Sequence, residues 1–157
     1  MVEDGLWLIF RLKEQALVPT MAKTKAGFYI GIEPVEVVDA HDQAAFEQAI
    51  IRVVRRGNPS VPTPPGGAQF PKSVLLKYAK LNSISAFDKI AKSWQLSKRE
   101  GAYLIIPYRP RKDTGAEENT ERGEAIPAEE PLETVVRRLV RRVLDVGDGT
   151  GGAPLKD

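Results

Sequence analysis

The amino-acid sequence predicts a single α+β domain, in which a small mixed sheet is covered by two or three helices. Apolar runs of strand length alternate along the chain with stretches whose apolar residues recur at helical spacing. The chain has 157 residues, which suits one domain, and its 42% hydrophobic and 28% charged composition allows a buried core under a charged surface. We expect an α+β core domain over residues 1–112, an acidic disordered linker over 113–130, an amphipathic helix over 131–146 and a flexible tail over 147–157.

Three apolar segments predict the strands of the sheet. Leu6–Leu12 is almost continuously apolar, which indicates a strand covered on both faces. Gln15–Lys25 is polar and predicts a loop, and Met21 within it is a candidate internal start of the functional chain. Phe28–Val38 and Ala102–Tyr108 predict the other strands. Pro107 and Pro110 would stop the last of these strands or leave it at a sheet edge.

Two helices are predicted to cover the sheet, over Asp42–Arg56 and Ser85–Gln95. In the first, Asp39 or Asp42 can accept from the free N–H groups of the opening turn, and Gly57 suits the position after the last turn. In the second, apolar residues fall at i, i+3, i+4 and i+7 after a Ser-x-x-Asp capping box: Phe87, Ile90, Ala91 and Trp94. A shorter helix is expected over Ser73–Lys80.

The loop between these helices, Asn58–Pro71, contains the P-x-x-P spacing twice, which is typical of polyproline II segments. Such a segment can dock in an aromatic groove or serve as a stiff surface connection. We favour the connection, because motifs this short recur by chance.

Charge is distributed unevenly, although the net charge is only +2. Residues 70–112 hold ten Lys or Arg against two acids, a net +8, and residues 113–133 hold eight acids against one Arg, a net −7. The basic segment suits an anionic partner, and the acidic segment could screen it. A solvated basic face with a solubilising tail is the other interpretation.

The C-terminal region divides at Pro131. Residues 113–130 have few apolar side chains, so burial cannot offset their ordering entropy, and we expect disorder. Pro131 suits the start of a helix whose apolar stripe lies over Leu132–Leu144 with four arginines opposite: Arg137, Arg138, Arg141 and Arg142. The stripe could pack on the sheet, enter a partner groove or pair in an oligomer.

Few residues are suited to catalysis. The chain has no cysteine and one histidine, so thiolate chemistry and cysteine-ligated metals are excluded. Asp39, His41 and Asp42 could in principle bind a metal or act as a base, but two of them suit helix capping and no second histidine supports a site. We expect no enzyme activity, cofactor or metal. Without a membrane-length apolar run or a signal sequence, we expect a cytoplasmic protein.

A family resemblance extends from Leu75 to Pro107. The helix pattern Ser85–Lys92, the polar turn Ser97–Gly101 and the apolar strand Ala102–Pro107 resemble some bacterial contact-dependent growth inhibition immunity proteins. The resemblance implies a small, cytoplasmic, non-catalytic protein that neutralises one toxin domain by binding it. The basic middle and the acidic extension of this chain depart from that pattern.

We therefore expect a bacterial binding protein of inhibitor or immunity type, whose partner presents an acidic protein surface. The expected contact residues are those of the basic segment that follow the second helix: Lys98, Arg99, Tyr108, Arg109, Arg111 and Lys112. The alternative is a nucleic-acid-binding protein that uses residues 70–112, with the acidic tail as an autoinhibitor. In that case, aromatic side chains interleaved with the basic ones would stack on bases: Tyr78, Trp94, Tyr103 and Tyr108.

Overall fold

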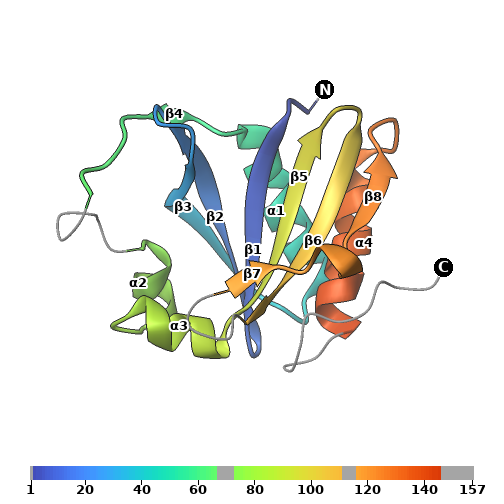
Figure 1. The fold of residues 1–157 in the computed structure, drawn as a ribbon. Helices are drawn as coiled ribbons and strands as arrows, with labels where there is room; N and C mark the ends of the chain where they lie inside the picture. The colour runs from blue at the N-terminus through green and yellow to red at the C-terminus, as the bar shows by residue number, and fades with distance from the viewer. Residues whose placement is uncertain (1, 67–72, 111–115, 146–157) are drawn as a thin grey trace.

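An eight-stranded sheet forms the centre of the structure (Figure 1). The computed structural model describes residues 2–66, 73–110 and 116–145. The main strand order is β3-β2-β1-β5-β6-β7, with antiparallel neighbours. These strands are β1 Gly5–Leu12, β2 Gln15–Thr24, β3 Tyr29–Asp39, β5 Lys92–Arg99, β6 Ala102–Pro110 and β7 Ala116–Glu118. Two short strands complete the sheet: β4, Ser60–Val61, is parallel to β2, and β8, Glu124–Pro127, is antiparallel to β6.

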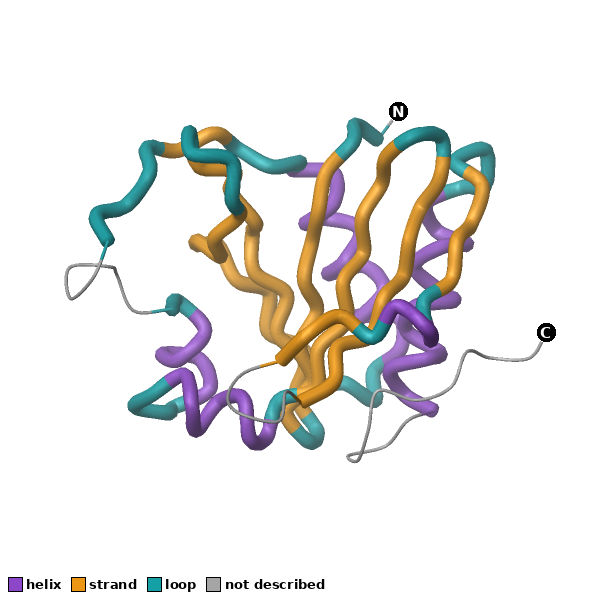
Figure 2. Tube along the Cα trace, in the orientation of Figure 1, coloured by secondary structure: helices purple, strands orange, loops and turns teal. Residues whose placement is uncertain are grey.

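The sheet is antiparallel except for β4, and helices cover both of its faces, so the predicted α+β fold class is confirmed (Figure 2). Helices α1, Gln43–Arg56, and α4, Leu132–Asp145, pack side by side on one face. The short helices α2, Leu75–Ala79, and α3, Ile84–Ile90, lie on the other. Strand β1 serves both layers, because successive side chains of a strand point to opposite faces: Trp7 and Ile9 join the core under α1 and α4, and Phe10 and Leu12 join the core under α2 and α3.

The first helix forms where local signals predict it. The Asp42 carboxylate accepts from the backbone N–H of Ala45 at 3.1 Å, and Gly57 follows the last turn with φ of 74°. One face of α1 is fully buried, through Phe46, Ala49 and Ile50 among others. Local caps and the buried stripe agree, and the observed helix is within one residue of the predicted one.

The predicted loop Gln15–Lys25 is wrong, because this segment is the interior strand β2. It pairs with β1 on one side and β3 on the other, and nearly all of its side chains are buried. The segment has polar residues such as Gln15 and Lys23 at its two ends, which favoured a loop, but its middle is apolar and includes the buried Leu17 and Val18. The N–H and C=O groups of β2 are hydrogen-bonded to the neighbouring strands β1 and β3. The polarity of the segment itself gives no sign of these distant partners.

The predicted helix Ser85–Gln95 is wrong in its second half. The helix α3 ends at Ile90, and its cap is Ser83 rather than Ser85, with Ser83 Oγ accepting from the N–H of Ala86 at 3.1 Å. From Lys92 onward the chain is strand β5, paired with β1 and β6. The side chain of Trp94 is therefore buried from a strand, and backbone pairing on both sides overrides the helical spacing of a few apolar residues.

Strand β6 passes through Pro107 and ends at Pro110, two residues beyond the predicted end at Tyr108. The outer edge of β6 pairs with β8 over Ala102–Ile105 and with β7 over Tyr108–Pro110. Pro107 falls in the gap between these two partners. A residue without an N–H is tolerated at such a position, where no neighbouring ladder needs its donor.

The acidic segment is ordered over residues 116–130, which corrects the predicted disordered linker. It forms β7, a 3-10 turn η2 over Thr120–Arg122, and β8 along the edge of the sheet. Ile126 enters the main core, and backbone pairing with β6 supplies the rest of the stabilisation. Residues 113–115 of the predicted linker and the predicted tail 147–157 lie outside the described residues.

The last helix, α4, belongs to the core of the same chain. Its apolar stripe is buried, with Val135, Leu139 and Val143 fully enclosed. Arg11 of β1 donates from Nη1 to the Val143 carbonyl at 3.0 Å, and so satisfies a free carbonyl at the negative end of the helix. Because the stripe is covered, the predicted oligomerisation through Leu132–Leu144 has no exposed apolar surface to use.

The first residues of the proline-rich loop are hydrogen-bonded to the end of β2. The carbonyls of Pro59 and Val61 accept from the N–H groups of Lys23 and Lys25, at 2.9 and 3.2 Å. Backbone bonding to the end of β2 thus engages the first P-x-x-P stretch. The second stretch, Pro62–Pro65, also lies in the described part, and residues 67–71 of the loop lie outside the described residues.

Candidate partner-binding surface

The Asp39, His41 and Asp42 group serves the start of α1. The Asp39 carboxylate accepts from the N–H of His41 at 2.8 Å, and Asp42 caps the helix. All three side chains are exposed, and His41 Nε2 lies 3.9 Å from a carboxylate oxygen of Glu14. Over residues 2–66, 73–110 and 116–145 no group of His, Asp and Glu is arranged to hold a metal ion. These residues therefore do local structural work.

The structure does not bring the predicted basic contact residues together. Lys98 and Arg99 lie where β5 ends, opposite Tyr103 and Ala102, and Arg109 lies seven residues further along β6. At a rise of about 3.3 Å per residue, the two groups are about 23 Å apart. Lys98 is also engaged, with its Nζ 3.4 Å from Asp4 and only 13% of its side chain exposed.

The other end of this strand is partly neutralised. Tyr108 donates from its hydroxyl to Gln95 Oε1 at 2.9 Å, and burial, followed by the charge of Glu118, raises the pKa of Tyr108 to about 12. Arg109 lies 3.5 Å from a carboxylate oxygen of Glu117 on β7. Arg111 and Lys112 lie outside the described residues. The acids of the supposed linker therefore pair with this end of the basic segment.

The interleaved aromatic residues do not form a stacking platform. Trp94 and Tyr103 are buried in the main core, and Tyr108 is held by Gln95. Tyr78 donates its hydroxyl to Glu33, which also pairs with Lys77 at 3.0 Å. Hydrogen bonds from Tyr78 and then Lys77 lower the pKa of Glu33. Base stacking requires exposed ring faces, so these contacts weigh against the nucleic-acid interpretation.

A surface that sequence reasoning missed lies on α3 and its flanks. We call it the α3 surface, and it consists of Lys80, Ile84, Lys89, Ile90 and Lys92. Ile84 and Ile90 are 51% and 42% exposed, and Lys80 and Lys89 are exposed beside them. The spacing of Ile84 and Ile90, three residues to either side of the buried Phe87, was visible in the sequence. Their exposure depends on where the helix sits.

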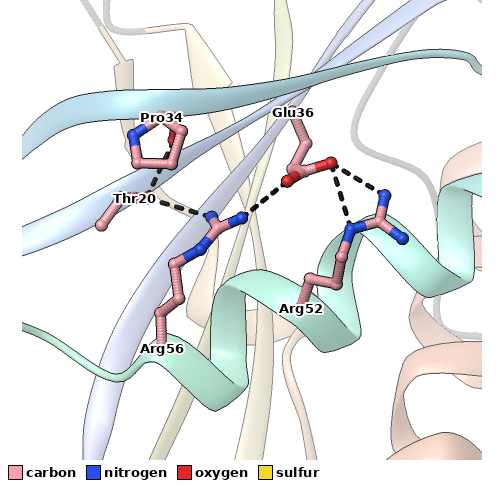
Figure 3. Close-up of polar contacts among 5 residues, drawn as sticks. All are labelled: Thr20, Pro34, Glu36, Arg52 and Arg56. Atoms are coloured by element: carbon pink, nitrogen blue, oxygen red, sulfur yellow. Dashed lines mark hydrogen bonds and ion pairs between the residues drawn. The ribbon is translucent and has the colours of Figure 1, made fainter.

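A second polar cluster joins β3 to α1 (Figure 3). Glu36 accepts from Arg52 Nη2 and Arg56 Nη2, each at 2.8 Å. Arg56 also donates to Thr20 Oγ1 at 3.2 Å, and that hydroxyl donates to the Pro34 carbonyl at 2.8 Å. The hydrogen bond from Arg52, then that from Arg56, lowers the pKa of Glu36 against the opposing effect of burial. This cluster clamps an edge strand onto the helix layer.

One of the four C-terminal arginines is not on the exposed face. Arg142 is 1% exposed, donates from Nη2 to the Arg122 carbonyl at 2.8 Å, and has Nη1 3.9 Å from Glu124. Burial lowers the pKa of its guanidinium. Arg138 bonds the same Glu124 at 2.9 Å. The predicted arginine face is thus partly a structural link between α4, η2 and β8.

Comparison with known proteins identifies a fold likeness. No family model and no curated protein sequence matches the chain. A protein of unknown function from Neisseria meningitidis is similar in structure, with a TM-score of 0.63 and 10% identity over 94% of this chain and 97% of that one. A chain of the CdiA-CT/CdiI toxin and immunity complex from Yersinia pseudotuberculosis is also similar, with a TM-score of 0.59 and 11% identity over 93% of this chain and 98% of that one.

These matches establish the class of fold. The second one is consistent with the resemblance to contact-dependent growth inhibition immunity proteins that the sequence indicated. At 10–11% identity the likeness concerns the fold alone. Within the described part of the chain, no helix has the length and apolar character needed to cross a membrane.

Proposed function

We propose that this protein is a non-catalytic, cytoplasmic binding protein of the immunity type, which neutralises a toxin domain by binding it. The observation that carries the proposal is the fold likeness to a chain of a toxin and immunity complex, which covers almost the full length of both chains.

The state of the polar residues supports a binding role. The Asp39, His41 and Asp42 group serves the start of α1. The arginines of α1 are ion-paired with acids of β3 and α4: Arg52, Arg55 and Arg56. Enzymes hold titratable groups together in a concave site. Here, the charged groups join elements of the fold to one another, and exposed surface remains for contact with a partner.

The test has two steps. The tagged full chain is used to capture partners from cells of its source organism, and each captured protein domain is then expressed from an inducible promoter in an indicator bacterium. We expect one domain to stop growth alone and to become harmless when this chain is expressed with it.

Two outcomes would overturn the proposal. The captured domains could be harmless when expressed alone, or a toxic one could remain toxic in the presence of the chain. Recovery of nucleic acid in place of a protein, with binding that falls steeply with salt, would favour the alternative that residues 70–112 contact phosphates.

A further inference from the structure

We propose that the partner docks on the α3 surface, and that it presents an apolar patch bordered by carboxylates. This inference rests on the proposed function and names the part of the molecule that performs it. It differs from the contact residues expected from the sequence, of which Lys98 and Arg99 at the end of β5 lie about 23 Å from Arg109 on β6.

The apolar part of the surface is unusual within this molecule. Among the described residues, four large hydrophobic side chains are exposed, and two of them are on this one short helix: Phe28, Val37, Ile84 and Ile90. The longer helices α1 and α4 bury their apolar stripes. Exposed apolar side chains form the dry centre of many interfaces.

The charge around these isoleucines is positive. Lys80 and Lys89 are exposed, Lys92 is half-buried at the start of β5, and Asp88 is the one acid in the described residues 73–99. Lys77, by contrast, is occupied by Glu33. Lysines in the same short segment as exposed isoleucines are complementary to carboxylates beside an apolar patch, and such complementarity accelerates association and excludes other partners.

The surface is also held in place before binding. Phe87 is buried and meets the ring of Phe10 edge-on, with centroids 5.3 Å apart and planes at 69°. The neighbouring helix α2 is tied to β3 through Tyr78, Lys77 and Glu33. A rigid surface loses little conformational entropy on binding, so more of the contact energy appears as affinity.

The test compares two apolar surfaces in the full chain, with the toxic domain from the growth assay as the probe. The variant Ile84→Ser with Ile90→Ser should raise the Kd for that domain by about 30-fold or more, as expected for the centre of an interface. Phe28→Ser is the matched control, because Phe28 is 42% exposed, as Ile90 is, but lies in the β2–β3 connection. The control should bind as the unaltered chain does.

A charge variant keeps the test decisive if the serine variant loses stability in a thermal melt. Lys89 is exposed, so Lys89→Glu should fold normally, and it should weaken binding by about 10-fold at low salt and less at high salt. Loss of binding in both variants, with the control unchanged, supports the proposal.

The outcomes separate this inference from the proposed function. If the unaltered chain protects cells and the α3 variants protect equally well, the docking surface is wrong and the function stands. If the unaltered chain does not protect cells, both the proposed immunity function and the proposed docking surface are wrong. If the variants dissociate a dimer of this chain but bind the toxic domain normally, the α3 surface joins two copies and the proposal is overturned.

Discussion

At the scale of single residues, the charges of this protein mainly join its layers. Glu36 is the clearest example, because one carboxylate on an edge strand holds two arginines of α1 and leaves no need for a further partner. Arg11 of β1 donates to the carbonyl of Val143 near the end of α4, and Arg142 of α4 donates to the carbonyl of Arg122 in η2, so both side chains also join elements. Charge patterns in the sequence that suggested a binding face are thus partly structural.

The substitution Glu36→Gln should destabilise the protein by about 1 kcal/mol at pH 7. Three charge-assisted hydrogen bonds are weakened, and the value is modest because Arg52 is half-exposed and screened by solvent. The folded-state pKa of Glu36 lies below its usual value, so the carboxylate stabilises the fold above the unfolded-state pKa, and this contribution is lost as pH falls through the folded-state pKa. Urea unfolding at pH 7 and at pH 2.5 measures both effects.

Glu129→Gln, an exposed acid in the turn before α4, is the control and should change the free energy of unfolding little at either pH. If the Glu36 and Glu129 variants unfold alike at pH 7, the Glu36 cluster does not clamp β3 to α1.

At the scale of elements, the structure decides what the apolar stripe of the C-terminal helix contacts. The sequence left open whether its apolar stripe covers the sheet, a partner or a second copy. The structure places α4 beside α1, with Val136 and Val140 fully buried. The helix is therefore a part of the folding unit, and substitutions in it act on stability before they act on binding.

The substitution Leu139→Ala should lower the free energy of unfolding by about 2–5 kcal/mol, because the side chain is fully buried and its removal leaves a cavity. Arg141→Ala, on the exposed side of the same helix, should change it by about 0.5 kcal/mol or less. Urea unfolding of both variants gives the comparison. Equal stability of the two variants would mean that α4 is detached from the core in solution.

At the scale of the whole molecule, β1 connects the two halves of the core. It lies between β2 and β5, and its alternate side chains reach the two helix layers. Removing it would leave both hydrophobic clusters without their shared wall. This arrangement bears on the idea that Met21 is the functional start.

A chain beginning at Met21 should not fold, because it lacks β1 and the first part of β2, in which Met21 itself is buried. Circular dichroism and the dispersion of amide NMR signals would show an unfolded chain. A chain beginning at Glu3, which keeps every strand, is the control and should give a folded spectrum. A dispersed spectrum from the Met21 chain would show that β1 is dispensable.

Part of the fold and little of the proposed docking surface could be predicted from the sequence. The α1 helix has a cap, an apolar stripe and a terminal glycine that act within a few residues of one another, so local signals were sufficient. The same holds for β1, whose apolar run reports burial on both faces. The α3 surface was not predicted, because exposure of Ile84 and Ile90 depends on how the helix sits on the sheet.

The sequence by itself determined the fold class, the helix Asp42–Arg56 and the strand Leu6–Leu12, since these depend on periodicity and caps over short distances. Only the tertiary structure decided that Gln15–Thr24 and Lys92–Arg99 are interior strands, that residues 116–130 form an ordered edge, and that Arg142 is buried. Each of these depends on backbone groups or charges finding partners that are distant along the chain. Pairing of that kind stabilises segments whose own composition favours a loop, a helix or disorder.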